Sequence, residues 1–383
     1  MKSAREKRLF RLVRIVCAVV FAIFAFTFLS LYKAPLLEVA YDLTATGKLQ
    51  YDENVTAAIL TVVLLLLTLW LNKFAKFSRE WEAFAYLPAC TLLAFATDVD
   101  RTIYTGGEFT WSWVWIGIAV TVVYMFASWV LQRVLFMRIK DITRATNRIM
   151  WRNLLLLSLL FCYTGFLSGG DENFKHDTMV YHYIKRGDYA SAKRVARRSL
   201  VASRQLTAAR AYLLAQEGEL GNLLFTYPQY YGAEGLLPTV EPTSPITLDS
   251  VCNYLKVIPG KDEKTIAFFQ RAARVDSAAV AVKDYYLSAL LLDRRLEEFV
   301  DSLPDFYNLA DTAMLPVHYK EALFLYDKIK DTPDPQFKDD ALEKRYAEFV
   351  TLEREHKDLL VRSNYVRRFF GDTYWWYYLY GGN

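Results

Sequence analysis

Five long apolar runs, all before residue 170, constrain this chain more than any other feature. They cover approximately residues 15–31, 55–71, 82–97, 111–131 and 153–168. About 20 predominantly apolar residues are the length that an α-helix needs to cross a bilayer. The following residues instead alternate apolar and charged side chains at helical spacing. The sequence therefore predicts an all-α chain, with a polytopic transmembrane bundle of about five helices in residues 1–170 and a soluble helical domain in residues 171–383.

Two of the five runs have an alternative interpretation. The first follows six basic residues and could be a cleaved signal peptide, but it is long for the apolar core of one and no A-x-A site closes it. We therefore predict a retained helix. The third run, residues 82–97, is short and contains Pro88, so its alternative is an interfacial or re-entrant segment.

Loop charge predicts the direction of these crossings. With the N-terminus inside, the inside segments 1–14, 72–82 and 133–152 carry six, three and six Lys and Arg residues, whereas the outside loops 32–54 and 98–110 carry three in all. Cytoplasmic loops of membrane proteins are enriched in Lys and Arg. The bias predicts a cytoplasmic N-terminus and a C-terminal domain outside the cytoplasm. This direction depends on the short third run, because it sets the parity of the crossings.

Charge and composition also disfavour two functional classes. Residues 171–383 hold 28 Lys and Arg against 31 Asp and Glu, so this half has no basic surplus of the kind that binds nucleic acid. No acidic, basic or histidine residue interrupts the middle of the apolar runs, although proton relays and ion paths usually need such groups. We therefore expect the bilayer, and no nucleic acid, as a partner.

A helix-turn-helix repeat is indicated at the start of the soluble half. The sequence from Gly187 to Ala192 has the pattern G-D-Y-x-x-A, which looks like the turn between the two helices of a tetratricopeptide (TPR) repeat. A second Gly-Glu-Leu turn follows at Gly218, close to one repeat period later. We predict a TPR-like α-solenoid, with an irregular helical bundle as the alternative. The predicted helices are residues 174–186, 189–203, 206–217, 277–292, 294–302, 317–329 and 337–360.

The helical pattern stops at residues 225–245, here called the aromatic loop. This segment contains four prolines and several tyrosines, and long ordered loops in compact domains are often functional. Its rings and hydrogen-bonding groups make it a candidate ligand or partner loop. The alternative is that these side chains only pack the loop onto the helices. The candidate residues are Tyr227, Gln229, Tyr230, Tyr231 and Glu234.

A second aromatic cluster, residues 369–380, is here called the aromatic tail. It is too short to span a bilayer and too aromatic for a free tail. Tyr374, Trp375, Trp376 and Tyr377 are candidates for the membrane–water interface, where Trp and Tyr are enriched. The alternative is a segment that caps the last helices.

No catalytic motif was found in the sequence. The patterns HExxH, GxSxG and GxxxxGK[ST] are absent, and the four histidines form no ligand or base pattern. The four cysteines include no CxxC pair, and only Cys252 lies in the soluble half. We therefore predict no catalytic residue, no cofactor and no metal site. An enzyme with a pocket near residues 225–245 is the alternative.

Four segments of the soluble half resemble a known family: AYLLAQEGELGNLLFTYPQYYGAEGLLP, DYYLSALLLDRRLEEFVDSL, LPVHYKEALFLY and GDTYWWYYLY. They are similar to an uncharacterised membrane protein family of the Bacteroidota, classed as a domain of unknown function, over most of residues 171–383. The resemblance implies a multi-pass protein of a Gram-negative inner membrane whose helical-repeat domain lies in the periplasm. It implies no catalytic residue.

The leading functional hypothesis from the sequence is an interaction scaffold. A membrane anchor would present the periplasmic helical-repeat domain to a peptide or an envelope protein. The alternative is a membrane component of an envelope transport or biogenesis system, and such a component would need a polar cavity among the apolar helices.

Overall fold

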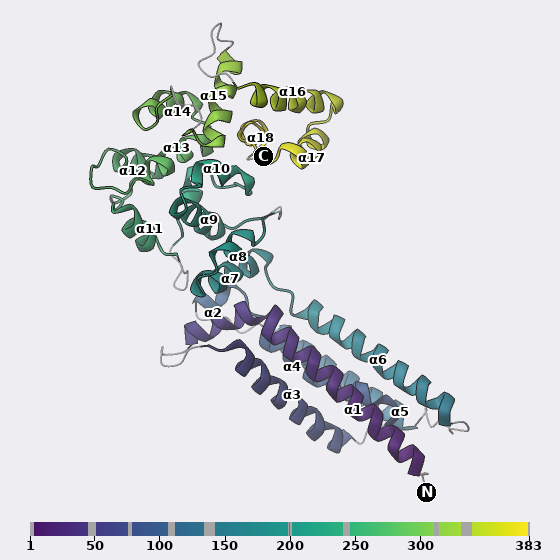
Figure 1. Cartoon of the computed structure of the whole chain (residues 1–383). Helices are drawn as coiled ribbons and strands as arrows, with labels where there is room; N and C mark the ends of the chain where they lie inside the picture. Colours follow the sequence, from purple (N-terminus) through teal and green to yellow (C-terminus); the bar gives the residue numbers. More distant parts are fainter. Residues whose placement is uncertain are drawn as a thin grey trace. The chain divides into compact units, whose positions relative to one another are not determined.

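The computed structural model describes residues 4–44, 51–75, 79–105, 112–133, 142–197, 199, 201–239, 246–309, 314–330 and 339–381. Every regular element within these ranges is helical, which confirms the all-α class (Figure 1). The chain forms two compact units, Met1–Thr178 and Met179–Asn383, whose boundary lies close to the one predicted after residue 170.

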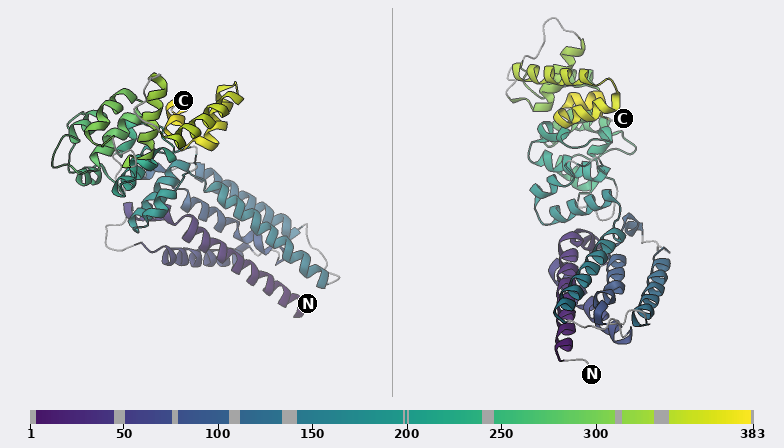
Figure 2. Two further views of the ribbon diagram at one scale, coloured as in Figure 1. Left: turned by 45° about the horizontal axis from the view of Figure 1, so that its top comes forward. Right: turned by 90° about the vertical axis from the view of Figure 1, so that its right-hand side faces the viewer.

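The first unit is a bundle of long helices joined by short helical segments. Helices α1, α3, α4, α5 and α6 run alongside one another in the views of Figures 1 and 2. Helix α2 occupies much of the segment that we predicted as an outside loop. The elements are α1 (Ala4–Thr27), the π-helix η1 (Phe28–Tyr32), α2 (Ala34–Thr44), α3 (Glu53–Ala75), the 3₁₀ helix η2 (Arg79–Tyr86), α4 (Leu87–Thr97), the 3₁₀ helix η3 (Arg101–Thr105), α5 (Ser112–Arg133) and α6 (Ile142–Leu167).

Three helical stretches of this unit are long and apolar enough to cross a membrane. They are Phe10–Tyr32, Glu53–Asn72 and Asn147–Leu167, and they confirm the first, second and fifth predicted crossings as candidates. Helix α4 has only 11 residues, because Pro88 stands in its first turn and the preceding residues form a 3₁₀ helix. In α5 the apolar stretch found within the described residues, Ser112–Tyr124, is shorter than a span. The third and fourth crossings stay predictions.

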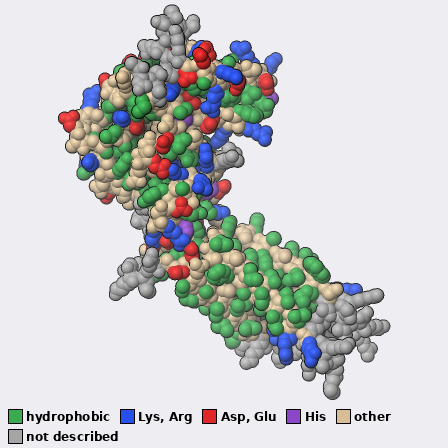
Figure 3. All heavy atoms as spheres, viewed as in Figure 1, with side chains coloured by type: hydrophobic (Ala, Val, Ile, Leu, Met, Phe, Trp, Pro, Cys, Tyr) green, Lys and Arg blue, Asp and Glu red, His purple; other side chains and the backbone are tan. Residues whose placement is uncertain are grey.

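The long helices of the first unit expose apolar side chains on one face and bury apolar side chains on the other. On α1 the buried positions recur at helical spacing at Val13, Cys17, Phe21 and Ala25. Figure 3 shows hydrophobic side chains covering most of the visible surface of these helices. An outward apolar face is expected where the surrounding medium is lipid. The exposed apolar residues include Leu12, Ile15, Val19, Ile23, Ile59, Val62, Leu66, Leu155, Leu159 and Phe166.

A buried carboxylate marks one end of this bundle. The side chain of Glu82, in η2, accepts hydrogen bonds from Arg14 Nε and from Asn72 Nδ2, each over 2.7 Å. Next to it, Asn153 of α6 accepts the backbone N–H of Ala83 through Oδ1 over 2.8 Å. The buried carboxylate is therefore paired with a cation from α1 and an amide from α3, while Asn153 of α6 holds the adjacent backbone.

A buried lysine marks the other end of the bundle. The ammonium group of Lys33, directly after η1, donates to the carbonyl oxygen of Thr97 over 3.3 Å and also to that of Ser168. These carbonyls lie at the C-terminal ends of α4 and α6, where helix carbonyls lack partners within the helix. The segment η2–α4 therefore lies against α6 at both of its ends.

The second unit is built from short helices with ordered caps. Side-chain oxygens of Ser203, Asp339, Asp358 and Thr373 cap the helices that they precede. Helix α7 begins before the boundary between the units. The elements are α7 (Glu172–Lys185), α8 (Tyr189–Arg194), α9 (Arg204–Gln216), α10 (Leu220–Leu223), η4 (Leu224–Thr226), η5 (Gly232–Leu236), α11 (Leu248–Leu255), α12 (Thr265–Ala272), α13 (Val282–Leu292), α14 (Leu296–Ser302), η6 (Leu303–Asp305), α15 (Val317–Lys330), α16 (Asp340–Glu355), α17 (Leu359–Phe370) and α18 (Tyr374–Tyr380).

Several predicted helices differ from the observed ones. The helix predicted at 189–203 is shorter in the structure, where α8 ends at Arg194. The buried guanidinium of Arg210 donates a hydrogen bond to the carbonyl oxygen of Val195, and Ala196 adopts a positive φ of 51°, so the helix cannot continue. The helix predicted at 337–360 corresponds to α16, which ends earlier, at Glu355, and the next helix, α17, begins after the cap Asp358 and was not predicted. Helices α11 and α12 were not predicted.

One turn geometry recurs between three helix pairs. In α7–α8, α9–α10 and α13–α14, the second residue after the first helix adopts a left-handed conformation, and the next amide donates to the carbonyl oxygen five residues earlier. This is the Schellman motif, which favours glycine at the left-handed position. Gly187 and Gly218 hold that position in the first two turns, whereas Arg294 holds it in the third, with φ of 57°. The bonds run from the amides of Asp188, Glu219 and Arg295 to the carbonyls of Tyr183, Leu214 and Leu290.

Candidate binding site

The aromatic loop is held on the second unit by its own side chains. Gln229 is buried and donates through Nε2 to the carbonyl oxygen of Leu224 over 2.9 Å. The ring of Tyr227 is also buried, with the guanidinium carbon of Arg210 4.8 Å from its centroid. The described part of the loop is therefore ordered, and its end, residues 240–245, lies outside the described residues.

Other loop residues bind neighbouring elements while remaining partly exposed. The carboxylate of Glu234 pairs with Arg204 over 3.0 Å and accepts the hydroxyl of Thr265 over 2.7 Å. The hydroxyl of Tyr231 donates to the carbonyl oxygen of Ala202 over 3.1 Å. These bonds fix the position of the loop on the second unit, so its exposed aromatic rings have a defined position on the surface.

The aromatic tail forms α18 and packs into the second unit. Tyr374 and Trp375 have no exposed surface. Of the two interpretations of the tail, these two side chains fit the packed segment, because a fully buried ring cannot reach a membrane–water interface. The hydroxyl of Tyr377 donates to the carbonyl oxygen of Leu292 over 2.7 Å, and burial raises the pKa of this phenol to about 12. The indole Nε1 of Trp376 donates to the backbone carbonyl oxygen of Ser363 over 3.3 Å.

A buried histidine–glutamate pair ties the aromatic loop to the aromatic tail. His318 Nε2 accepts the backbone N–H of Phe225 over 3.3 Å, which leaves the proton of the neutral imidazole on Nδ1. That nitrogen lies 2.9 Å from Oε2 of Glu321, which also accepts the backbone N–H of Tyr374 over 2.8 Å. The ring of Phe225 stacks edge-on against His318 and Tyr374, with centroids 5.1 Å apart in both pairs.

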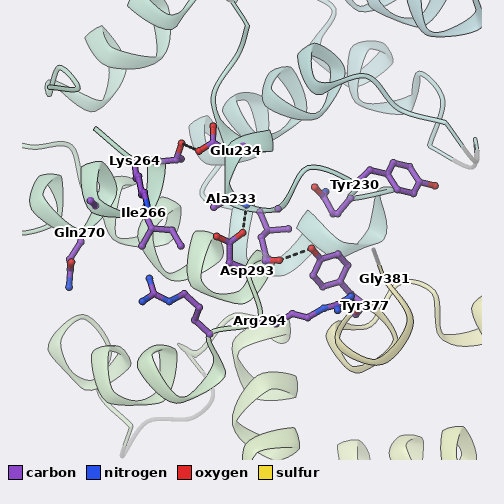
Figure 4. Close-up of a pocket in the computed structure, with 16 residues that line it drawn as sticks. Tyr230, Ala233, Glu234, Lys264, Ile266, Gln270, Asp293, Arg294, Tyr377 and Gly381 are labelled. Carbon is purple, nitrogen blue, oxygen red and sulfur yellow. Dashed lines mark hydrogen bonds between the residues drawn. The ribbon is translucent and has the colours of Figure 1, made fainter. Parts of the chain in front are cut away.

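Loop and tail together line a cavity of about 910 Å³, here called the α12 cavity. Figure 4 shows Tyr230, Asp293, Arg294 and Tyr377 on one side of this space and Lys264, Ile266 and Gln270 on the other. The backbone N–H of Ala233 donates to Asp293 Oδ1 over 2.7 Å. The wall is completed by Gln229, Gly232, Glu234, Lys264, Thr265, Ile266, Ala267, Gln270, Leu292, Arg295 and Gly381.

A second cavity of about 740 Å³, here called the α17 cavity, adjoins the first. Its wall combines aromatic rings of the loop and the tail with one face of α17. The guanidinium carbon of Arg367 lies 5.1 Å from the ring centroid of Trp376. The wall consists of Arg197, Ser199, Phe225, Thr226, Tyr227, Pro228, Gln229, Tyr230, Leu359, Leu360, Ser363, Asn364, Arg367, Arg368, Gly371, Trp376, Tyr377, Tyr380 and Gly381.

The structure brings together most of the residues that the sequence indicated separately. Among the loop candidates, Tyr227, Gln229, Tyr230 and Glu234 line at least one cavity, whereas Tyr231 lines neither. Among the tail candidates, Trp376 and Tyr377 line the cavities, whereas Tyr374 and Trp375 support them from the core.

Sequence reasoning missed the charged part of both walls. Asp293 and Arg294 follow a helix that was predicted only as part of a repeat. Arg367 and Arg368 stand in the run NYVRRFF, directly before the aromatic tail. Two adjacent arginines directly before an aromatic cluster are the sequence signal that could have indicated a binding surface there.

These features define an all-helical protein with a membrane-type helical unit and a second unit carrying two adjoining cavities. The chain belongs to a family of unknown function (DUF6057), whose pattern matches residues 5–255 and 260–381. This confirms the resemblance to a family of unknown function. No curated protein and no solved structure matches the chain.

Proposed function

We propose that this protein is a five-pass inner-membrane protein whose second unit binds a peptide, or a peptide segment of an envelope protein, in the periplasm. The α12 and α17 cavities form its binding groove. One observation carries this proposal: the aromatic loop and the aromatic tail, which lie far apart in the sequence, meet to line both cavities. Pockets of about 300–1,000 Å³ with aromatic walls and a few polar groups are typical of ligand sites.

The contacts of η2–α4 support the third crossing, which these two short helices would make in place of one long helix. It begins beside Asn153 of α6 and ends beside Ser168, through the Ala83 amide at one end and Lys33 at the other. It therefore accompanies α6 along its apolar length, with charged side chains only near its two ends and one hydroxyl contact between them, from Thr91 to Tyr163 over 3.2 Å. A 3₁₀ turn lengthens such a segment, because it rises about 2.0 Å per residue instead of about 1.5 Å.

The direction of the crossings rests on loop charge and on parity. Fifteen Lys and Arg residues lie in the segments assigned to the cytoplasm, against three in those assigned outside. The three helices of full length are also an odd number. The second unit therefore lies opposite the N-terminus whenever η2–α4 and α5 both cross or both do not.

Reporter fusions test this topology. Alkaline phosphatase or a fluorescent protein is fused after Arg79, Gly107, Asn147 and Gly170. We expect cytoplasmic signals after Arg79 and Asn147 and periplasmic signals after Gly107 and Gly170. Equal signals after Arg79 and Gly107 would remove the third crossing, and a cytoplasmic signal after Gly170 would refute the compartment.

Site-specific photo-crosslinking in cells tests the binding role. A photoreactive phenylalanine replaces Tyr230, which lines both cavities and is 44% exposed. The matched control replaces Tyr189, a tyrosine of similar exposure, 46%, on α8 outside both walls. We expect a crosslinked polypeptide from position 230 and none from position 189. Equal crosslinking at both positions would argue against a specific site.

A further inference from the structure

All the charged side chains in the wall of the α17 cavity are positive. Arg197, Arg367 and Arg368 line it, and its wall includes no carboxylate among the described residues. The stacking of Arg367 on Trp376 holds one guanidinium in place before any ligand arrives. A cavity with this wall favours an anionic group, and guanidinium groups bind carboxylates through paired charge-assisted hydrogen bonds.

The α12 cavity differs in this respect. Its two carboxylates already have partners, because Glu234 pairs with Arg204 and Asp293 accepts the amide of Ala233. Positive and negative groups therefore both occur in its wall. A ligand that reaches across both cavities would place its negative charge in the α17 cavity and its neutral part in the other.

The two cavities form a continuous site for an extended ligand. They share the side chains of Gln229, Tyr230 and Tyr377, together with Gly381. Tyr230 is partly exposed at this junction, and the rim of the α17 cavity is apolar at Leu360, which is 75% exposed. An elongated chain with both apolar and charged groups fits these walls better than a compact ion.

Arg294 adds one cation to the wall of the α12 cavity, next to the shared Tyr377. Arg294 holds the left-handed position at which two equivalent turns have glycine, and a non-glycine residue is disfavoured there. Its side chain donates to the carbonyl oxygen of Tyr377 over 3.3 Å and lies over the Tyr377 ring, in the wall of the α12 cavity.

We propose that the α17 cavity binds carboxylate groups, so that the ligand of this protein is an acidic peptide with its negative side chains in the α17 cavity. This inference rests on the proposed function and narrows it to one class of peptide.

Binding of matched peptides to the full-length protein in neutral detergent tests the inference. Three short peptides share one aromatic residue and one length, and carry glutamate, glutamine or lysine at the same positions. Fluorescence anisotropy gives each Kd. We expect the glutamate peptide to bind at least about tenfold more tightly than the glutamine peptide, as expected for one charge-assisted hydrogen bond. The substitution Arg368→Gln should abolish this preference, whereas Arg354→Gln, at an exposed site on α16 outside the wall, should keep it.

Each outcome separates the two proposals. Equal binding of the glutamate and glutamine peptides would overturn the acidic preference while leaving peptide binding intact. No binding of any peptide would overturn both. Vesicles of phosphatidylglycerol that compete with the glutamate peptide, where phosphatidylcholine vesicles do not, would assign the arginines to a lipid headgroup instead. Thermal unfolding of both variants serves as the control, since a loss of binding caused by misfolding would lower their Tm.

Discussion

Removing the carboxylate of Glu321 should loosen the aromatic loop and the aromatic tail together. Glu321 is fully buried, and its Oε2 accepts the Tyr374 amide and faces the Nδ1 proton of His318. The substitution Glu321→Ala leaves both donors buried without an acceptor, at about 1–3 kcal/mol each. We therefore expect the free energy of unfolding of the second unit to fall by about 2–6 kcal/mol. This is a large part of the total stability of a typical domain, about 5–15 kcal/mol.

Glu321→Gln is the matched control for this substitution. Both hydrogen bonds converge on Oε2, so one amide oxygen placed there can still accept them. The amide nitrogen then takes the place of Oε1, which has no hydrogen-bond partner and lies 4.0 Å from Nη1 of Arg345. We expect the glutamine variant to lose at least about 1 kcal/mol less than the alanine variant.

Two measurements on the full-length protein in detergent check this reasoning. Urea unfolding followed by tryptophan fluorescence gives the stabilities, and hydrogen exchange read by mass spectrometry reports the peptides that cover residues 224–237 and 371–381. In the alanine variant both peptides should exchange faster together. If the alanine and glutamine variants agree within about 0.5 kcal/mol, the carboxylate does not hold the two segments as argued. Faster exchange in only one segment would likewise break the argument.

Two further substitutions test the packing and the electrostatics of the structure. Gly221→Ala would place a Cβ atom 2.7 Å from Pro316 Cβ and 2.9 Å from Tyr319 Cζ, so we expect it to lower the free energy of unfolding by about 1–3 kcal/mol. The control Gly117→Ala, whose Cβ would meet no atom within 4 Å, should not lower it. Thermal unfolding compares the two variants. Burial raises the pKa of Asp284 above its usual value of 3.8, so the native state binds more protons, and stability falls as pH rises from that value through the raised pKa. Asp284→Asn should therefore gain stability relative to the natural protein as pH rises, and parallel Tm profiles against pH would contradict this.

The helical class and the division into two halves were predictable because both follow from local periodicity. The turns at Gly187 and Gly218 were also visible in the sequence, since one residue type supplies the left-handed conformation. The equivalent turn at Arg294 carries no such signal. The early end of α8 was not predictable either, because Arg210 of a different helix takes the carbonyl that would have continued it.

The candidate site was predictable only in parts. The aromatic loop and the aromatic tail were each distinct by composition, but nothing local indicates that they meet. Their connection runs through His318 and Glu321, which occupy ordinary positions on an amphipathic helix, α15. Whether a histidine is a surface residue or a buried link depends on contacts distant in the sequence. The arginines of α17 were missed for the same reason.

The shared wall of the two cavities has a consequence for biosynthesis. Tyr230 and Tyr377 stand at the same junction, so the groove does not exist until α18 has been synthesised and has docked. Contacts so far apart in the sequence form slowly, because the closing of long loops must precede them. While the chain is still being translated, the groove is therefore incomplete, and no ligand can bind in it. If the second unit is exported as proposed, the groove first meets its ligand in the compartment where the protein acts.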